Sequence, residues 1–285
     1  MNTAQTWFIT GASSGFGHAF AEHAIAQGHR VVASARRVES LAPLVAQAPD
    51  RVLAVSLDVD QPGAAEAAVA AAAARFGRID VLINNAGYGV VGALEETPDA
   101  ELRAIFDTNF FGALAVTRAA LPLLREQRGG AIVNISSLGG QLSFAGFSAY
   151  SATKFALEGA SEALAQEMAP FGVKVLIVEP GQFRTNLAGA GMRHMPRMAA
   201  YDDVVGGTRE FAHEMHQTQS GDPRRAAAAI ERALSAERTP LRLQLGGDSV
   251  DAVRAHAQAL LADMDAWEAA SRATDFDLAN PVVAR

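Results

Sequence analysis

The sequence of 285 residues has no cysteine, which excludes disulfide bonds, thiolate nucleophiles and cysteine-ligated metals. Basic residues are in the minority, with 24 Lys and Arg against 31 Asp and Glu, and this balance argues against a general nucleic-acid-binding surface. The N-terminus carries no basic leader, and no apolar run is long enough to span a membrane. We therefore expect a cytoplasmic protein with neither nucleic-acid nor membrane partners.

The seven histidines do not form a pattern typical of metal ligands. His213 and His216 lie three residues apart on an expected helix, but no third ligand accompanies them. Solvated histidines explain the pair more simply, and we expect no bound metal.

Short apolar runs alternate with helical patterns through most of the chain. The runs are rich in Val, Ile and Leu without polar alternation, which is typical of strands buried on both faces of a parallel sheet. We predict strands at 7–10, 30–34, 51–57, 79–84, 131–136, 173–179 and 241–245. This alternation predicts an α/β fold: a Rossmann-type, doubly wound, mostly parallel seven-stranded sheet with helices on both faces, in a single domain.

Beyond Gly181 the pattern changes. Residues 186–220 hold several methionines and glycines, and we expect them to form a substrate loop or lid that includes a helix around 202–219. Another helix is expected at 222–236, and residues 246–285 are expected to form a C-terminal helical extension. The sequence leaves open whether this extension caps the substrate site or covers the edge of the sheet.

Three glycines, Gly11, Gly15 and Gly17, lie between the first predicted strand and a predicted helix. Glycines in such a turn let the backbone approach a pyrophosphate, which binds the free N–H groups of a helix N-terminus. They can also serve only to pack a strand against a helix. The spacing Thr-Gly-x-x-x-Gly-x-Gly resembles that of the short-chain dehydrogenase/reductase family, and the resemblance extends from Thr6 to Thr185.

The end of the second predicted strand distinguishes the two nicotinamide cofactors. An acidic residue about 20 residues past the glycine loop would bind a ribose 2′-hydroxyl and favour NAD. Here Ala35 is followed by Arg36 and Arg37, and a guanidinium suits a 2′-phosphate. We therefore predict NADP(H) as cofactor with Arg36 as its main contact, while Arg37 is either a second contact or a solvated charge.

The family resemblance implies further cofactor contacts. Asp58 and Val59 match the pair that holds the adenine ring, and the Asn-Asn-Ala-Gly segment ending at Gly87 matches the one that lines the cofactor cleft. The Pro-Gly segment after the sixth strand matches the one that holds the carboxamide. The complete expected cofactor site comprises Gly11, Ser13, Ser14, Gly15, Phe16, Gly17, Arg36, Arg37, Asp58, Val59, Asn85, Ala86, Gly87, Tyr150, Lys154, Pro180, Gly181, Phe183 and Thr185.

A phenol and an ammonium lie four residues apart at Tyr150 and Lys154, so a helix would place them on one face. A cation beside a phenol favours the phenolate and lowers its pKa from about 10. Ser137 ends a predicted strand thirteen residues earlier, where parallel sheets bind ligands; its neighbour Ser136 is the less well spaced alternative. The family carries its catalytic Ser, Tyr and Lys in this arrangement, and its fourth residue, an asparagine, is matched by Asn109.

The resemblance also implies roles for these four residues in carbonyl reduction. Ser137 would hold the substrate carbonyl, and Tyr150 would donate the proton. Lys154 would lower the tyrosine pKa and bind the nicotinamide ribose, and Asn109 would order a water that links Lys154 to solvent. A catalytically idle NADP(H)-sensing protein and an interaction protein that needs no nucleotide are the alternatives on the same fold.

The expected substrate pocket is mainly apolar, which favours a hydrophobic ketone or aldehyde, or the corresponding alcohol, as substrate. Two observations weigh against this: the apolar residues could merely pack a lid, and Arg184, Arg193 or Arg197 could bind an anion. The expected pocket residues are Ser137, Leu138, Phe144, Phe147, Tyr150, Leu187 and Met192, with Phe183, Met195 and Met198 as further apolar neighbours.

The resemblance further implies a homodimer or homotetramer, built on long helices expected around residues 99–126 and 148–170. The alanine-rich and apolar patterns of both segments permit close packing.

Overall fold

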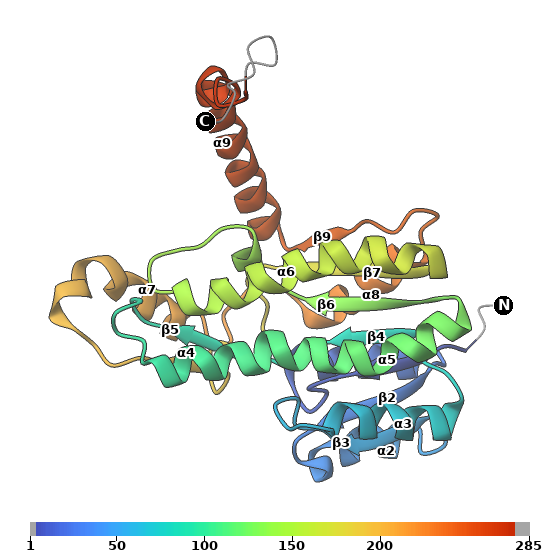
Figure 1. Cartoon of the computed structure of the whole chain (residues 1–285). Helices are drawn as coiled ribbons and strands as arrows, with labels where there is room; N and C mark the ends of the chain where they lie inside the picture. The colour runs from blue at the N-terminus through green and yellow to red at the C-terminus, as the bar shows by residue number, and fades with distance from the viewer. Residues whose placement is uncertain (1–3, 277–285) are drawn as a thin grey trace.

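The computed structural model describes residues 4–276 and contains a seven-stranded, wholly parallel sheet in the order β3-β2-β1-β4-β6-β7-β9 (Figure 1). The predicted fold class is confirmed, and every predicted strand is present with its ends moved by no more than two residues. The strands are β1 Thr6–Ile9, β2 Arg30–Ala35, β3 Val52–Ser56, β4 Val81–Asn84, β6 Gly130–Ile135, β7 Val173–Pro180 and β9 Arg242–Leu245.

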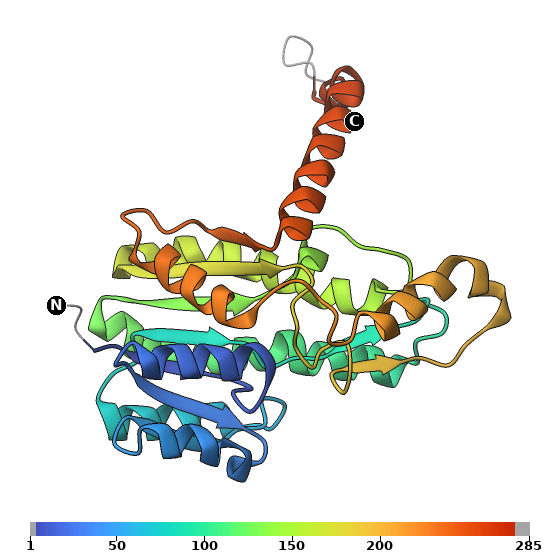
Figure 2. The same cartoon turned by 180° about the vertical axis from the view of Figure 1, so that it is seen from behind.

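Helices cover both faces of this sheet. One face packs against α1 (Gly15–Ala26), α2 (Ala42–Gln47) and α8 (Pro223–Ser235), as Figure 2 shows from behind. The other face packs against α3 (Ala64–Phe76), α5 (Ala113–Gln127) and α6 (Ser148–Met168). Because the strands are buried on both sides, their side chains need no polar alternation, which explains their unbroken Val, Ile and Leu runs.

The strand order reverses between β1 and β4. The chain leaves β1 toward one side of the sheet and leaves β4 toward the other, so a crevice opens beyond the carboxyl ends of these two strands. The glycine loop follows β1, and the Asn-Asn-Ala-Gly segment follows β4. The topology therefore brings the two predicted cofactor segments to the same edge of the sheet.

The long helix expected at 99–126 is interrupted, which corrects that expectation. The chain forms α4 (Asp99–Phe106), a π-helical segment (Asp107–Gly112) and only then α5. Gly112 packs so closely on the Val59 side chain that a Cβ atom would lie 2.6 Å from it. The π turn buries Asn109, and such turns often occur at functional sites.

The first part of the expected substrate loop contains a short strand that the sequence analysis did not predict. The strand β8 (Met192–His194) pairs in parallel with β5 (Gly89–Val91) as a separate two-stranded sheet. Gly89 makes this possible, because a Cβ atom there would lie 2.7 Å from the sulfur of Met192. The helix α7 (Asp202–Glu214) then begins where a helix was predicted but ends five residues before the expected residue 219.

The described part of the C-terminal extension projects from the body as one long helix, α9 (Gly247–Arg272), in both views (Figures 1 and 2). It neither lies over the substrate side nor runs along the edge of the sheet. Residues 277–285 of the predicted extension lie outside the described residues. Among the described residues, no helix is both long and apolar enough to cross a membrane.

Candidate active site

The glycine loop is fastened to the segment after β4 by hydrogen bonds. The Thr10 hydroxyl accepts the backbone N–H groups of Asn85 and Ala86 at 2.8 and 2.9 Å. In return, the Asn85 amide donates to the carbonyl oxygen of Thr10 at 2.9 Å. Gly17 lies against this junction, where a Cβ atom would be 2.4 Å from the carbonyl oxygen of Gly11. The loop therefore accepts no side chain at Gly17, and its backbone path is fixed.

The start of α1 has the features of an anion site. Ser14 precedes the helix without capping it through its side chain, and no acidic residue occupies the first turn. The first backbone N–H groups of a helix have no intrahelical acceptor, and they carry partial positive charge. A hollow of about 390 Å³ lies beside them, lined by Gly15, His18, Ala19, Arg184, Thr185, Asn186, Gln217, Asp222, Pro223 and Arg224. The residues present therefore fit a pyrophosphate.

The two arginines after β2 are exposed. Within the described residues neither guanidinium has a hydrogen-bond or ion-pair partner. Burial raises the pKa of Asp60, and the nearby charge of Arg36 opposes part of that rise. The backbone carbonyl of Arg36 accepts a hydrogen bond from Ser56 at 3.4 Å, which ties it to the end of β3. Both guanidinium groups are thus available to an anionic ligand.

Ser137 and Tyr150 meet at the carboxyl end of β6. Ser137 begins a short 3-10 turn, and its hydroxyl oxygen accepts the N–H of Gly139 at 3.0 Å. Tyr150 lies in the first turn of α6, and its pKa is raised by burial and lowered by a hydrogen bond with Ser137. Phe147 flanks the phenol at 6.4 Å between ring centroids. The hydroxyls of Ser137 and Tyr150 therefore converge on one point, as the spacing predicts.

Lys154 lies one turn further along α6, with its ammonium 5.7 Å from the centre of the Tyr150 ring. The ammonium donates to the carbonyl oxygen of Ile135 at 2.8 Å. Burial lowers the pKa of Lys154 to about 8, although the carboxylate of Glu158 opposes the shift. The sequence predicts that Lys154 lowers the pKa of Tyr150. In this structure the pKa of the phenol is instead raised, because burial has the larger effect.

Asn109 holds the turn after Gly87. Its amide donates to the carbonyl oxygen of Tyr88 at 2.9 Å and to the hydroxyl of Thr153 at 3.2 Å, and it accepts the N–H of Tyr88 at 3.0 Å. A Cβ atom on Gly87 would lie 2.9 Å from the amide oxygen. The π-helical segment thus couples the cofactor cleft to α6 beside Lys154.

The pKa of Lys154 yields a direct prediction, because Lys154 and Lys174 are the only lysines in the sequence. In protein labelled with ¹³C-lysine and free of ligand, we expect the Lys154 signal to titrate with a midpoint of about 8. Because the pKa of Lys154 is lower in the folded protein than in the unfolded chain, its charge reduces the free energy of unfolding, and this reduction is complete below pH 8. The reduction disappears as the pH rises from 8 toward 10.5.

Glu158→Gln supplies the comparison for this titration. It removes the carboxylate that raises the pKa of Lys154, so the midpoint should move further down. Lys174→Arg identifies the second signal. A Lys154 midpoint near the ordinary value of 10.5, or one that Glu158→Gln leaves unchanged, would contradict the electrostatic description.

The adjacent serine is used differently. Ser136 is buried and donates to the carboxylate of Glu158 at 2.7 Å. Glu158 shares Arg242 with Glu179, at 3.0 and 3.2 Å from the arginine Nε atom. Burial and the neighbouring Glu158 raise the pKa of Glu179 to about 7. This network ties α6 to β7 and β9 beneath the site, and Ser136 belongs to it.

The segment after β7 is held by two residues that the sequence did not point to. Asp248 accepts the N–H of Gln182 at 2.6 Å, and Ser249 donates to the carbonyl oxygen of Glu179 at 2.7 Å. A Cβ atom on Gly181 would lie 2.2 Å from the Asp248 carboxylate. The first turn of α9 thereby fixes the Pro-Gly segment. Asp248 lies 66 residues from Gln182 in the sequence, and no local sequence pattern links the two.

Phe183 has a different environment from the one expected for an apolar substrate neighbour. Its ring is buried in the core and lies 5.0 Å from the ring of Phe16. Thr185 is buried beside Gly15, and a Cβ atom on Gly15 would lie 3.4 Å from the Thr185 side chain. The side chain of Phe183 thus supports the glycine loop from below, and its backbone is the part that remains for a ligand.

The expected pocket side chains divide into two groups. Phe144 and Leu187 are exposed, at 52% and 39%, whereas Leu138, Phe147 and Met192 are partly buried. Of these, Phe147 lies beside the Tyr150 ring, so an apolar side chain borders the phenol.

Met195 instead packs as part of a lid core. It is buried in a cluster with Val90, Ile105 and Ala149. Met198, by contrast, is 39% exposed. The competing interpretation, in which methionines pack the lid, therefore holds for Met195.

The three arginines that could bind an anionic substrate all have partners in the protein. Arg184 donates to the carbonyl oxygen of Gln219 at 3.0 Å. Arg193 pairs with Glu101 at 2.9 Å, and Arg197 pairs with Asp202 at 2.6 Å. Engaged guanidinium groups bind a further anion less readily.

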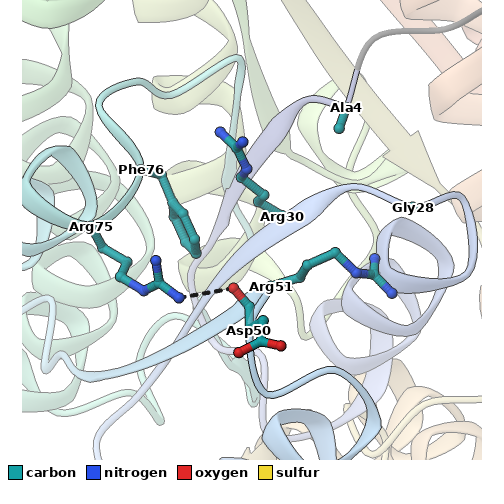
Figure 3. Close-up of a pocket in the computed structure, with 7 residues that line it drawn as sticks. All are labelled: Ala4, Gly28, Arg30, Asp50, Arg51, Arg75 and Phe76. Atoms are coloured by element: carbon teal, nitrogen blue, oxygen red, sulfur yellow. Dashed lines mark hydrogen bonds between the residues drawn. The ribbon is translucent and has the colours of Figure 1, made fainter.

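A larger hollow, of about 520 Å³, lies at the opposite edge of the sheet (Figure 3). Arg30 and Arg75 lie over the ring of Phe76, and Arg75 donates to the carbonyl oxygen of Asp50 at 2.9 Å. Figure 3 shows that the guanidinium groups of Arg30 and Arg51 point in different directions. Its lining residues Ala4, Arg30 and Arg51 lie at the amino ends of β1, β2 and β3, whereas parallel sheets bind ligands at the carboxyl ends of their strands. This hollow is therefore not the candidate site.

The fold and the site together define a doubly wound nucleotide-binding oxidoreductase with a Ser, Tyr and Lys constellation. Residues 5–196 match the family model described as short chain dehydrogenase. This protein belongs to the short-chain dehydrogenase/reductase family.

Several relatives and solved structures are similar over most of the chain. An oxidoreductase from Botryotinia fuckeliana is 39% identical, over 94% of this chain and 98% of its own length. A 3-ketodihydrosphingosine reductase from Bacteroides thetaiotaomicron is 37% identical, over 85% and 88%. A short-chain dehydrogenase structure from Streptomyces avermitilis has a TM-score of 0.91 at 54% identity, covering 96% of this chain and 100% of that one.

A further structural neighbour bears on the cofactor. A short-chain dehydrogenase/reductase from Burkholderia phymatum, solved in complex with NAD, has a TM-score of 0.78 at 25% identity, over 88% of this chain and 92% of that one. The family thus uses nicotinamide dinucleotides, and the choice between NAD and NADP is a separate question.

Proposed function

We propose that the protein is an NADP(H)-dependent reductase of hydrophobic ketones or aldehydes, with Asn109, Ser137, Tyr150 and Lys154 as its active-site residues. The observation that carries the proposal is the convergence of the Ser137 and Tyr150 hydroxyls at the carboxyl end of β6, beside buried Lys154. The pyrophosphate-sized anion site at α1 lies at the same edge of the sheet.

The chain's own groups supply the proton and the orientation. Ser137 accepts the N–H of Gly139, which leaves its own proton for donation: to the Tyr150 oxygen in this structure, and to a carbonyl oxygen when a substrate takes that place. The raised pKa of Tyr150 keeps the phenol protonated at neutral pH, as a proton donor to that oxygen must be. A bound reduced nicotinamide would supply the hydride. Hydride at carbon and the Tyr150 proton at oxygen together give the alcohol.

Lys154 acts on Tyr150 after the phenol has donated its proton. Its ammonium lies close enough to the Tyr150 ring to stabilise the phenolate left after proton donation, and it would bind the nicotinamide ribose. Asn109 positions α6 through Thr153 and the cleft through Tyr88. In this proposal it also orders the water that returns a proton by way of Lys154.

Arg36 gives the proposal its cofactor preference. A guanidinium bonded to a phosphate contributes roughly 1.5–3 kcal/mol, so Arg36→Leu should raise the KM for NADPH by about 10- to 100-fold. The KM for NADH should change little, because NADH has no 2′-phosphate. Arg37→Leu is the matched control and should have the smaller effect. A wild-type protein with higher kcat/KM for NADH than for NADPH would refute the assignment.

The hydrophobic substrate class rests on two features. Apolar Phe147 packs beside Tyr150, and Arg184, Arg193 and Arg197 are engaged by the protein. The relative from Bacteroides thetaiotaomicron is named as a reductase of 3-ketodihydrosphingosine, which supports a ketone as the substrate. A panel of lipophilic and carboxylated ketones tests the hydrophobic class, and turnover confined to the carboxylated compounds would overturn it.

A further inference from the structure

The helix α9 is exposed for most of its length. Its 26 residues extend for about 39 Å at 1.5 Å per residue. Every residue from 254 to 276 is exposed. Figures 1 and 2 show it standing away from the body. Isolated helices are only marginally stable in water, and most helices in proteins depend on packing of an apolar face.

The base of α9, in contrast, is firmly fixed. Asp248 and Ser249 bond the backbone around Glu179 and Gln182, and Ser249 is fully buried. The helix therefore leaves the body in a defined direction, and the side chains of its outer part are exposed.

Apolar residues recur along α9 with alternating spacings of three and four. They are Val250, Val253, Ala257, Leu260, Met264 and Trp267. This is the heptad spacing of a two-helix coiled coil, in which the residues of one seam pack against the seam of a second helix. Three of them are large and highly exposed: Leu260 at 55%, Met264 at 60% and Trp267 at 69%.

We propose that α9 pairs with the α9 of a second copy of this chain as an antiparallel coiled coil. The charges beside the seam select this direction. A parallel pair would place Asp263 of each helix beside Glu268 of the other, and like charges repel. An antiparallel pair centred between Ala257 and Leu260 instead places His256 beside Asp263 of the second copy, where an imidazole can donate to a carboxylate.

This register defines which residues share a layer. Ala257 packs against Leu260 of the second copy, and Val253 packs against Met264 of the second copy. The two bodies then lie at opposite ends of the paired helices. The inference concerns assembly and does not depend on the proposed catalytic activity.

Cross-linking tests the pairing cleanly because the chain has no cysteine of its own. Val253→Cys and Met264→Cys proteins are prepared separately, then oxidised alone and as a mixture. We expect a disulfide-linked dimer only in the mixture, because each cysteine lies beside the other position. Cross-linking of Met264→Cys alone would indicate parallel helices and would overturn the proposal, as would no cross-link in any sample.

Leu260→Lys provides the second arm of the experiment. Placed in both cysteine variants, it should reduce the cross-link yield at least about tenfold by putting charge in the seam. The matched control is Asp265→Lys, which lies outside the seam and should leave the yield unchanged. The fluorescence emission of Trp267 should shift to longer wavelength in Leu260→Lys, because the unpaired helix leaves the indole in water. The Trp267→Phe variant shows which part of the emission comes from Trp267 and which from buried Trp7. Equal yields in both lysine variants would contradict pairing along this seam.

Discussion

Replacing Tyr150 by phenylalanine should lower kcat for ketone reduction by about 10²- to 10⁴-fold, the usual contribution of a positioned proton donor. The substitution removes one oxygen and keeps the ring, which packs beside Phe147. Folding and cofactor binding should therefore survive, and NADPH affinity should change by less than about threefold. Steady-state kinetics, with NADPH binding measured separately by fluorescence, gives both quantities.

Tyr201→Phe is the matched control, since it also removes one phenol. The hydroxyl of Tyr201 is engaged elsewhere, because it donates to the carboxylate of Glu95. Its kcat should be that of the wild type within a factor of about two. If Tyr150→Phe kept similar turnover in a folded protein, the proton donor would have to be a different group.

The neighbouring serines should respond to the same substitution in opposite ways. Ser137→Ala removes the hydrogen bond that we propose Ser137 donates to the substrate carbonyl, and the loss of one such donor costs about 10²- to 10³-fold in kcat. Ser137 is only partly buried, so the free energy of unfolding should change little. Kinetics and urea denaturation on the same preparation measure the two effects.

Ser136→Ala should instead act on stability. It leaves the buried carboxylate of Glu158 without one of its donors, which costs about 1–3 kcal/mol of unfolding free energy. Its kcat should fall far less than that of Ser137→Ala. A catalytic collapse in Ser136→Ala together with an active Ser137→Ala would show that the two positions had been exchanged.

The strands and the catalytic spacing could be predicted from the sequence because both depend on local patterns. Strands buried on two faces need continuous apolar runs, and these mark the seven strands to within two residues. The separation of Tyr150 and Lys154 by four positions places them together on any helix. The glycines of the first loop likewise mark a tight backbone turn that only their small size allows.

Features that depend on contacts between distant segments could not be predicted. The π-helical turn around Asn109 follows from packing of Gly112 on Val59, and helical periodicity alone suggests an unbroken helix. The three-residue strand at Met192 exists because Gly89 leaves room for a methionine side chain. The anchor from Asp248 to Gln182 joins positions with no sequence pattern in common.

The buried network around Glu158 shows the same limit. Charged residues are rarely buried without partners, and no sequence pattern indicates which partners Glu158 and Glu179 have. The structure buries both and supplies Arg242 from β9 as their shared cation. This network supports Ser136, and it explains why two adjacent serines at the end of one strand have different surroundings.

The central claim is that the Ser137–Tyr150–Lys154 site reduces carbonyl compounds with a nicotinamide cofactor. The most direct measurement follows NADPH oxidation with a lipophilic ketone, in wild type and in Tyr150→Phe, and identifies the alcohol by mass. The account predicts stoichiometric alcohol from the wild type and a loss of at least about 10²-fold in the variant. Bound NADPH with no turnover of any ketone or aldehyde, or equal turnover in both proteins, would contradict it.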